Sequence, residues 1–290
     1  MQEFKGKVAV VTGAASGIGR GLVERFASEG MSVVLSDIEK EPLAIADQEL
    51  QSDGADVLAV QTDVSSLESV EALRDQVLER FGKVHILCNN AGVSGGGGAD
   101  GIWNATAADW NWVLGVNLMG VIHGIQAFVP SMIDHGEEGH IVNTSSVLGL
   151  SSGDGSTYSV SKHAVTRLTE GLHHDLRLAE SKIGASVLCP GMIATNIILA
   201  DRNRPAELKG EAIDPERSEM LGLKQERFLA DGMPPDEVGD IVFESIRDER
   251  FYILTHPDTG IKDRVRDRMD DIIEQRDPTP PPMFSLARGG

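Results

Sequence analysis

Short apolar runs rich in β-branched residues alternate with longer segments of helical periodicity along most of this chain. The first run, 8–11, is followed by a glycine-rich stretch and then by apolar residues at helical spacing. Nearly continuous apolar runs are typical of strands that helices cover on both faces. The alternation therefore predicts right-handed βαβ units around one parallel sheet.

The expected elements form one doubly wound α/β domain, the Rossmann fold. We expect strands at 8–11, 32–36, 56–60, 84–88, 139–144, 185–189 and 251–254, and helices at 20–28, 43–51, 67–81, 109–134, 157–178, 235–247 and 259–275. After Pro190 the alternation breaks, and residues 192–233 are expected to form a helical flap over the carboxyl edge of the sheet. The domain is expected to span residues 1–258, followed by a charged helix and a proline-rich tail over 259–290.

The composition argues against several classes of partner. The net charge of −19 disfavours nucleic acid and anionic membranes, since both bind basic surfaces. Two cysteines, Cys88 and Cys189, do not make a disulfide framework and indicate a reducing compartment. We find no apolar run of membrane-spanning length and no signal peptide, so a cytoplasmic protein is expected. His173 and His174 lack the acid or cysteine spacing of a metal site, and no metal is expected.

A glycine-rich loop, residues 12–19, joins the first strand to the first helix. Gly13, Gly17 and Gly19 follow the spacing G-x-x-x-G-x-G, which lets the chain turn tightly and lets a phosphate approach the backbone. The N-terminus of the following helix offers free N–H groups and a positive dipole to an anion. In this position the loop indicates a dinucleotide-binding site.

Asp37 stands at the end of the second expected strand, about 20 residues past the loop, where a ribose-binding acid is expected. Its carboxylate would accept a hydrogen bond from the adenosine 2′-hydroxyl and would repel a 2′-phosphate. Neither Ile38 nor Ser16 supplies a cation that would offset this repulsion. The cofactor is therefore predicted to be NAD rather than NADP.

Tyr158 and Lys162 are four residues apart on an expected helix, and Ser145 and Ser146 precede them. Residues i and i+4 share a helix face, so the Lys162 ammonium is expected near the Tyr158 hydroxyl. A nearby cation favours the phenolate and would lower the pKa of Tyr158 from about 10. The tyrosine would then serve as an acid/base near neutral pH, with a serine hydroxyl holding an alcohol or carbonyl oxygen.

Seven pieces in a fixed order identify a family that residues 5–195 resemble, the short-chain dehydrogenases/reductases. They are the loop 12–19, Asp63-Val64, Asn89-Asn90-Ala91-Gly92, Asn117, Ser145-Ser146, Tyr158-Ser159-Val160-Ser161-Lys162 and Pro190-Gly191-Met192-Ile193-Ala194-Thr195. The resemblance implies an NAD-dependent alcohol dehydrogenase. It implies that Tyr158 is the acid/base, that Lys162 binds the nicotinamide ribose and lowers the tyrosine pKa, and that Asn117 holds a water in a proton relay.

The resemblance also implies the cofactor contacts. Asp63 and Val64 would contact the adenine, the segment 90–92 would pass under the adenosine ribose, and Ile193 and Thr195 would bind the carboxamide. The complete expected set is Gly13, Ser16, Gly17, Ile18, Gly19, Asp37, Ile38, Asp63, Val64, Asn90, Ala91, Gly92, Tyr158, Lys162, Pro190, Gly191, Ile193 and Thr195.

Two neighbouring residues compete for the role of catalytic serine. The family usually has this serine thirteen residues before the tyrosine, which is Ser145. It is also usually followed by x-x-Gly, which fits Ser146 through Gly149. We favour Ser146, because strand geometry sets side-chain direction more strictly than loop length does.

The expected reaction is hydride transfer between NAD and a secondary alcohol or ketone. Apolar residues after Met192 suggest an apolar pocket roof, while Arg202 and Arg204 are expected to be solvated. The substrate is therefore expected to be neutral, bulky and apolar, a class that includes aromatic and alicyclic alcohols. The alternatives are an NADP-dependent ketoreductase and a non-catalytic NAD-binding regulatory protein.

A homotetramer, or else a homodimer, is expected from two helices with apolar residues on more than one face. One face of each helix must pack on the sheet, and a second apolar face would be unfavourable in water. The residues concerned are Val113, Val116, Val121, Ile122 and Ile125 in 109–134, and Val160, Ala164, Val165, Leu168 and Leu172 in 157–178. The tail 278–283 is expected either to reach a neighbouring subunit or to be disordered.

Overall fold

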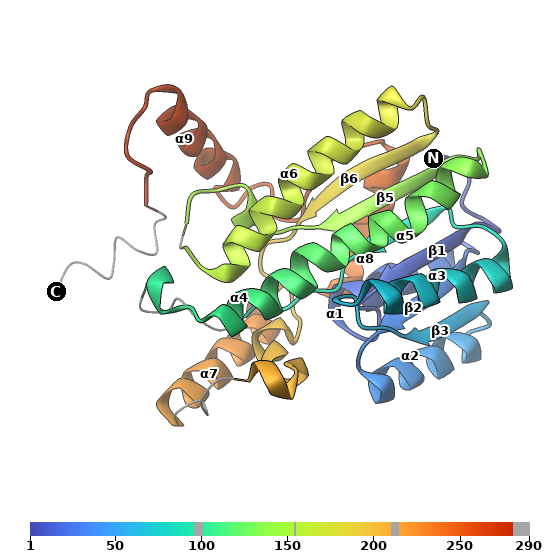
Figure 1. Cartoon of the computed structure of the whole chain (residues 1–290), viewed down its shortest axis with the longest axis horizontal. Coiled ribbons are helices and arrows are strands. Elements are labelled where there is room, and N and C mark those ends of the chain that lie inside the picture. Colours follow the sequence, from blue (N-terminus) through green and yellow to red (C-terminus); the bar gives the residue numbers. More distant parts are fainter. Residues whose placement is uncertain (96–100, 154, 210–214, 281–290) are drawn as a thin grey trace.

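A seven-stranded parallel sheet forms the centre of the chain, with helices on both faces (Figure 1). The computed structural model describes residues 1–95, 101–153, 155–209 and 215–280. The strand order is β3-β2-β1-β4-β5-β6-β7. The strands are β1 (Val8–Thr12), β2 (Ser32–Asp37), β3 (Val57–Gln61), β4 (Ile86–Asn89), β5 (Gly139–Thr144), β6 (Ile183–Cys189) and β7 (Tyr252–Leu254). The predicted doubly wound α/β fold is confirmed.

Within the described residues, six helices cover the two faces of the sheet, and α4, α7 and α9 lie outside these layers. The helices in this part of the chain are α1 (Gly17–Ser28), α2 (Lys40–Ser52), α3 (Leu67–Phe81), α4 (Ala107–Leu114), α5 (Gly120–Asp134), α6 (Thr157–Leu178), α7 (Pro215–Asp231), α8 (Pro235–Arg247) and α9 (Ile261–Ile273). Alternate β1 residues point to opposite faces. Ala9 and Val11 join one core with α1, α2 and α8, whereas Val8 and Val10 join a second core with α3, α5 and α6.

The strand order reverses direction between β1 and β4, which makes this junction a topological switch point. From β1 the chain proceeds outward to β2 and β3, then returns to β4 on the other side of β1. The connecting loops separate at such a point and leave a crevice at the carboxyl ends of the strands. The topology therefore creates a binding site between the ends of β1 and β4.

The predicted continuous helix over 109–134 is wrong in one respect. The structure has α4, a π-helical turn η2 (Gly115–Met119) and α5 in succession. Asn117 lies in this turn, completely buried, with its side chain bonded to Val93 and Ser161. A π-turn inserts an extra residue and rotates the following helix, and such turns are frequent at functional sites.

By length and composition, the helical segment Ala107–Asp134 could cross a membrane, although the sequence predicted no segment of this kind. Within the described residues it is the one such candidate, with a mean hydropathy of 1.5. Its most apolar window is 56% buried, and α5 packs on α3 and β4. Its apolarity is accounted for by its place in the core.

The segment after β6 leaves the sheet and returns to it. Main-chain hydrogen bonds join Met233 to Met192 and Ala194, and an isolated bridge pairs Ile193 with Met233. Between these points lie the 3₁₀ turns η4 (Ile197–Asn203) and η5 (Ala206–Leu208), followed by α7. We call the described part of residues 192–233 the flap. It has the helical character that the sequence predicted.

The C-terminal extension lies beside the loop that follows β5. Arg268 donates from Nη1 to the Leu150 carbonyl at 3.2 Å, and the Ser152 hydroxyl donates to the Thr279 carbonyl at 2.8 Å. The Thr279 N–H in turn donates to Asp271 at 2.7 Å. The predicted proline-rich tail is described only to residue 280, and the rest of the predicted segment 278–283 lies outside the described residues.

Candidate active site and cofactor cleft

A cleft of about 2190 Å³ follows the carboxyl ends of the strands and is bounded on its other side by the flap. Sites for single small molecules usually measure about 300–1,000 Å³, so this cleft has room for both a cofactor and a substrate.

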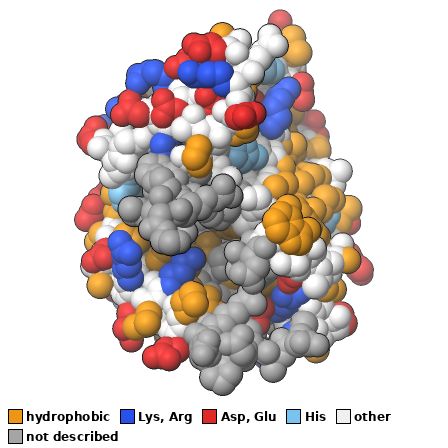
Figure 2. Space-filling view, turned by 90° about the vertical axis from the view of Figure 1, so that its left-hand side faces the viewer, with side chains coloured by type: hydrophobic (Ala, Val, Ile, Leu, Met, Phe, Trp, Pro, Cys, Tyr) orange, Lys and Arg blue, Asp and Glu red, His pale blue; other side chains and the backbone are white. Residues whose placement is uncertain are grey.

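Figure 2 views the molecule from the side on which α4, α7 and α9 lie in Figure 1. Basic and acidic side chains are interspersed over that face.

The glycine loop fits an anion bound against its backbone. Gly13 and Gly17 have φ angles of +66° and +55°, which L side chains rarely adopt. A Cβ atom at Gly17 would lie 2.9 Å from the Thr195 methyl carbon, so no side chain fits there. The Ser16 side chain does not cap α1. The first N–H groups of α1 therefore receive no cap from Ser16, and phosphate binding by this loop stays a prediction.

Asp37 lies at the end of β2, beside the glycine loop. Its Oδ2 atom accepts a hydrogen bond from the Ala15 N–H, and its Oδ1 atom accepts one from the Glu39 N–H, each at 3.0 Å. Burial raises the pKa of Asp37, while these hydrogen bonds act in the opposite direction. Each oxygen retains a lone pair for a sugar hydroxyl.

The ends of β1 and β4 are held together by one hydroxyl. Thr12 Oγ1 accepts hydrogen bonds from the N–H groups of Asn90 and Ala91 at 3.0 and 3.1 Å. Asn90 Nδ2 donates back to the Thr12 carbonyl at 3.0 Å. Gly13 approaches so closely that a Cβ atom there would lie 2.9 Å from Ala91 Cα. This contact forms the floor of the predicted ribose site.

The remaining predicted cofactor residues occupy the rim of the same cleft. Asp63 and Val64 follow β3, and Pro190, Gly191, Ile193 and Thr195 follow β6. The Gly191 N–H donates to Thr255 Oγ1 at 3.0 Å. Of the complete predicted set, all residues except Gly19 line the cleft. Gly19 instead permits close packing, because a Cβ atom there would lie 2.0 Å from the Gly13 carbonyl oxygen.

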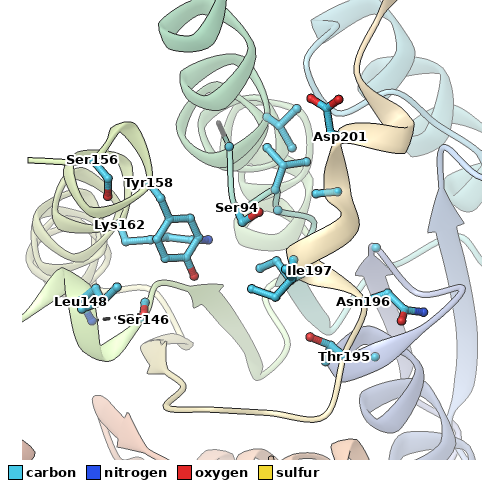
Figure 3. A pocket seen from close by; sticks show the side chains of 18 of the residues that line it. Ser94, Ser146, Leu148, Ser156, Tyr158, Lys162, Thr195, Asn196, Ile197 and Asp201 are labelled. Carbon is cyan, nitrogen blue, oxygen red and sulfur yellow. Dashed lines mark hydrogen bonds between the residues drawn. The ribbon is translucent and has the colours of Figure 1, made fainter. Parts of the chain in front are cut away.

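Tyr158, Lys162 and Ser146 lie on one side of the cleft, opposite Ile197 of the flap (Figure 3). Lys162 is 2% exposed, and its Nζ atom donates to the Thr144 carbonyl at 2.9 Å. The same nitrogen is 5.6 Å from the centroid of the Tyr158 ring. Burial lowers the pKa of Lys162 to about 8.

The pKa of Tyr158 departs from its ordinary value in the direction opposite to the sequence-based prediction. Burial raises the pKa of this phenol, and only partial compensation comes from a hydrogen bond with Ser146. The Lys162 amine is directed to the Thr144 carbonyl, and burial of the phenol is the dominant effect on the Tyr158 pKa. The i,i+4 spacing predicted the proximity of the two side chains but not the direction of the amine.

The two candidate serines have different surroundings. Ser145 is 1% exposed, and its hydroxyl donates to the Lys162 carbonyl at 2.7 Å and contacts Thr166 Oγ1 at 2.8 Å. The Ser146 hydroxyl lies beside Tyr158 and accepts from the Leu148 N–H at 3.1 Å (Figure 3). The geometry therefore favours Ser146 for contact with a ligand and gives Ser145 a role in anchoring α6.

Asn117 connects three parts of the site. Its Oδ1 atom accepts from the Val93 N–H at 2.8 Å, while Nδ2 donates to the Val93 carbonyl and to Ser161 Oγ, each at 3.0 Å. A Cβ atom at Gly92 would lie 3.3 Å from Lys162 Nζ and 3.4 Å from Asn117 Oδ1. Asn117 thus fixes the backbone beside the lysine. Its proposed water-holding role stays a prediction.

The prediction that both flap arginines are solvated is wrong for Arg204, whereas Arg202 is exposed but paired. Arg204 is 8% exposed, pairs with Asp109 at 2.7 Å and lies over the Trp112 ring at 5.1 Å. Arg202 forms two hydrogen bonds with the carboxylate of Glu39. Their partners are far away in sequence, so no local pattern could have identified them.

Within the described residues there is no group of three His, Cys, Asp or Glu side chains that could hold a metal ion. His173 lies edge-on to Phe251, with ring centroids 5.0 Å apart, and edge-on to His174. Both cysteines are buried, and burial raises the pKa of Cys189 to about 12. These side chains have packing roles.

The fold and the cleft define a Rossmann-fold protein with a tyrosine–lysine pair beside a dinucleotide site. Residues 7–205 match the family model described as short chain dehydrogenase, and the chain belongs to this family. A short-chain dehydrogenase/reductase from Burkholderia phymatum, solved in complex with NAD, is 48% identical with a TM-score of 0.90, over 97% of this chain and 99% of that one.

Two further relatives match along nearly their whole length. The CLA biosynthesis dehydrogenase/reductase of Lactiplantibacillus plantarum is 36% identical over 92% of this chain and 94% of its own. The 1-deoxy-11-beta-hydroxypentalenate dehydrogenase of Streptomyces avermitilis is 35% identical over 91% and 89%. The chain is therefore an oxidoreductase that uses a nicotinamide dinucleotide and acts on an alcohol or ketone.

The low pKa of Lys162 generates a pH prediction. From about pH 8 to about pH 10.5, the unfolded chain binds a proton at this position that the folded chain does not. The wild-type free energy of unfolding should therefore rise with pH across this window, relative to that of Lys162→Met, and the difference should be constant below about pH 7. The expected change approaches about 1.4 kcal/mol per pH unit within the window.

Urea unfolding of both proteins at several pH values measures this difference. Tyr158 and the cysteines also titrate at high pH, but they are present in both proteins and cancel to first order. A difference that does not vary with pH would show that the Lys162 pKa is ordinary.

Proposed function

We propose that this protein uses NAD to oxidise a neutral, bulky, apolar secondary alcohol, or uses the reduced cofactor to produce one from a ketone. The observation that carries the proposal is the placement of the Tyr158 and Ser146 side chains side by side on one wall of the cleft (Figure 3). Two hydroxyls so placed can hold one substrate oxygen. The opposite wall carries Ile197, which favours an apolar carbon skeleton.

In the proposed oxidation, Tyr158 takes the proton of the substrate hydroxyl as general base. Ser146 donates a hydrogen bond to the same oxygen while negative charge develops on it. When bound, NAD supplies the hydride acceptor and a positively charged ring that favours the Tyr158 phenolate. Lys162, held by Thr144, and Asn117, held by Val93, position the groups around the tyrosine.

The preference for NAD is proposed from Asp37 and its surroundings. Both carboxylate oxygens face the glycine loop and the start of α2, where they can accept from ribose hydroxyls. Arg202 lines the cleft near this region, and it is already paired with Glu39. The structure of the Burkholderia phymatum relative with NAD supports the same choice. An NADP-dependent ketoreductase is the alternative that these residues oppose.

The substrate class is proposed from the walls of the cleft. Leu148, Met192, Ile197 and Ile198 line it, and the charge of Arg204 is neutralised by Asp109. Lys209, Lys224 and Arg264 also line the cleft, but they are exposed or half-buried.

The alternative of a regulatory protein that only binds NAD is opposed by the catalytic set. Such a protein would not need Asn117, Ser146, Tyr158 and Lys162.

An alcohol panel tests the substrate proposal directly. Matched aryl, alicyclic and short aliphatic secondary alcohols are each offered with NAD, together with analogues that carry a remote carboxylate, and reduced cofactor is followed by its absorbance. Bulky neutral alcohols should have the highest kcat/KM. A preference for the carboxylate analogues would overturn the neutral class and would point to Lys209, Lys224 and Arg264.

We also propose a cytoplasmic location, which fractionation of the native cells tests.

Replacing Asp37 tests the cofactor preference. Wild-type protein should bind NAD much more tightly than NADP, and Asp37→Ala should narrow the gap, because the carboxylate that repels the 2′-phosphate is removed. Titration of both cofactors by intrinsic tryptophan fluorescence measures the two affinities. Asp63→Ala, at the adenine end of the cleft, is the matched control and should weaken both cofactors similarly. Equal affinities in the wild type would contradict the proposal.

Replacing Tyr158 tests the acid/base assignment. Tyr158→Phe should leave NAD affinity nearly unchanged and reduce kcat by roughly a hundred- to ten-thousand-fold, the usual worth of general acid–base catalysis. The control is Tyr252→Phe, the other tyrosine of the chain, which is exposed and bonded to Glu170. A loss of less than about tenfold in the Tyr158 variant would assign proton transfer to another group.

We propose that the protein is a homotetramer, or else a homodimer, built on α5 and α6. Val113, Val121 and Val165 are buried within one chain, so part of the expected second face is already used. Val160 remains 44% exposed, and Ile122, Ala164, Leu168 and Leu172 remain half-buried. Light scattering in dilute solution should give a multiple of 31.1 kDa, and the mass of a single chain would rule the oligomer out.

A further inference from the structure

An ion pair joins the flap to the loop that follows β2. Arg202 Nε donates to Glu39 Oε1 at 2.9 Å, and Arg202 Nη2 donates to Glu39 Oε2 at 2.7 Å. The third nitrogen, Nη1, donates to the carbonyls of Asn196 and Leu199 at 3.3 and 3.0 Å. All three nitrogens are thus engaged, two by the loop and one by η4 itself. Such a planar bidentate pair specifies orientation as well as attraction.

The two ends of this pair lie at the cofactor cleft. Glu39 and Arg202 both line it, and the Glu39 N–H donates to Asp37, the proposed ribose acid. Figure 3 shows Asn196, Ile197 and Asp201 of the flap across the cavity from Tyr158 and Lys162, and Arg202 is the next residue along η4. The contact therefore spans from the flap to the adenosine end of the cleft.

Arg202 has a strong effect on its partner. Its hydrogen bonds lower the pKa of Glu39, and the Asn203 side chain, also from η4, acts in the same direction. The carboxylate is therefore ionised at neutral pH. The Glu39 carboxylate therefore interacts with two consecutive residues of the flap, Arg202 and Asn203.

A second arginine of the same segment is held in a different way. Arg204 pairs with Asp109 where both side chains are at most 12% exposed, whereas the Arg202 side chain is 39% exposed. Breaking a buried pair leaves an uncompensated charge, but an exposed pair exchanges with water at small cost. The segment is thus held to α4 by the buried Arg204 pair and to the loop after β2 by the exposed Arg202 pair, which opens at smaller cost.

We propose that Arg202 is a cofactor-positioning residue whose ion pair with Glu39 fastens the flap across the adenosine end of the cleft. The dinucleotide enters or leaves when this pair opens, so the pair slows cofactor dissociation. The inference rests on the proposed dinucleotide function of the same cleft. It adds a residue from the flap to a site that is otherwise built from the ends of the strands.

Dissociation of reduced NAD from the full-length protein, followed by stopped-flow fluorescence without substrate, tests this proposal. Arg202→Gln and Glu39→Gln should each raise the dissociation rate by about two- to fivefold, the worth of an exposed ion pair. The double variant should dissociate no faster than the faster single variant, because both changes remove one contact. The dissociation rate of Arg202→Lys should lie between those of wild type and Arg202→Gln, since lysine keeps the positive charge but cannot form the bidentate pair. About 1 M salt should shrink all the differences.

Arg80→Gln is the matched control, since Arg80 and Asp56 form an exposed pair away from the cleft. It should leave the dissociation rate unchanged. Wild-type rates in the Arg202 and Glu39 variants, or strictly additive effects in the double variant, would overturn the proposal while leaving the cofactor site intact. A wild-type protein that binds no dinucleotide at all would overturn both the proposed function and this role of Arg202.

Discussion

The burial of one ammonium group, that of Lys162, is the constraint on which the rest of the site depends. A buried amine needs an acceptor, and the Thr144 carbonyl at the end of β5 supplies it. The space around Nζ is so tight that Gly92 cannot carry a side chain without moving it. Asn117 fixes Val93, the residue after that glycine, and the π-turn directs its amide there. The lowered pKa of the lysine is the energetic consequence of this arrangement.

The two walls of the cleft are built differently. One wall is part of the sheet, and the other is a segment that is attached to the rest of the fold at a few points. The first wall consists of the strand ends, where the Thr12 hydroxyl binds the backbone of Asn90 and Ala91. The other wall is the flap, which is attached through main-chain bonds at Met233, the buried pair of Arg204 and the exposed pair of Arg202. Of the two ion pairs, the Arg204 pair is buried and the Arg202 pair is exposed. Ligand exchange is easiest where an attachment faces water.

The fold could be predicted almost completely, because its signals are local. Each strand is a short apolar run, and each covering helix shows a 3.6-residue period, so the alternation specified the parallel sheet. The differences are confined to the ends of elements and to the helix over 109–134. A π-turn leaves no mark on hydropathy, since Gly115 and Gly120 read as ordinary helix residues in an apolar segment. Only the burial of Asn117 against Val93 and Ser161 reveals why the helix is interrupted.

By itself, the sequence determined which chemical groups are available and on which elements they stand. The glycine loop, Asp37 and the Tyr158–Lys162 spacing are each encoded within a few residues of a strand or helix end. The tertiary structure decided what those groups do to one another. It directed Lys162 to Thr144, raised the pKa of Tyr158 by burial, distinguished Ser146 from Ser145, and paired Arg202 with Glu39 across 163 positions of sequence. The physical reason is that desolvation and ion pairing depend on distances in space, which a local pattern does not contain.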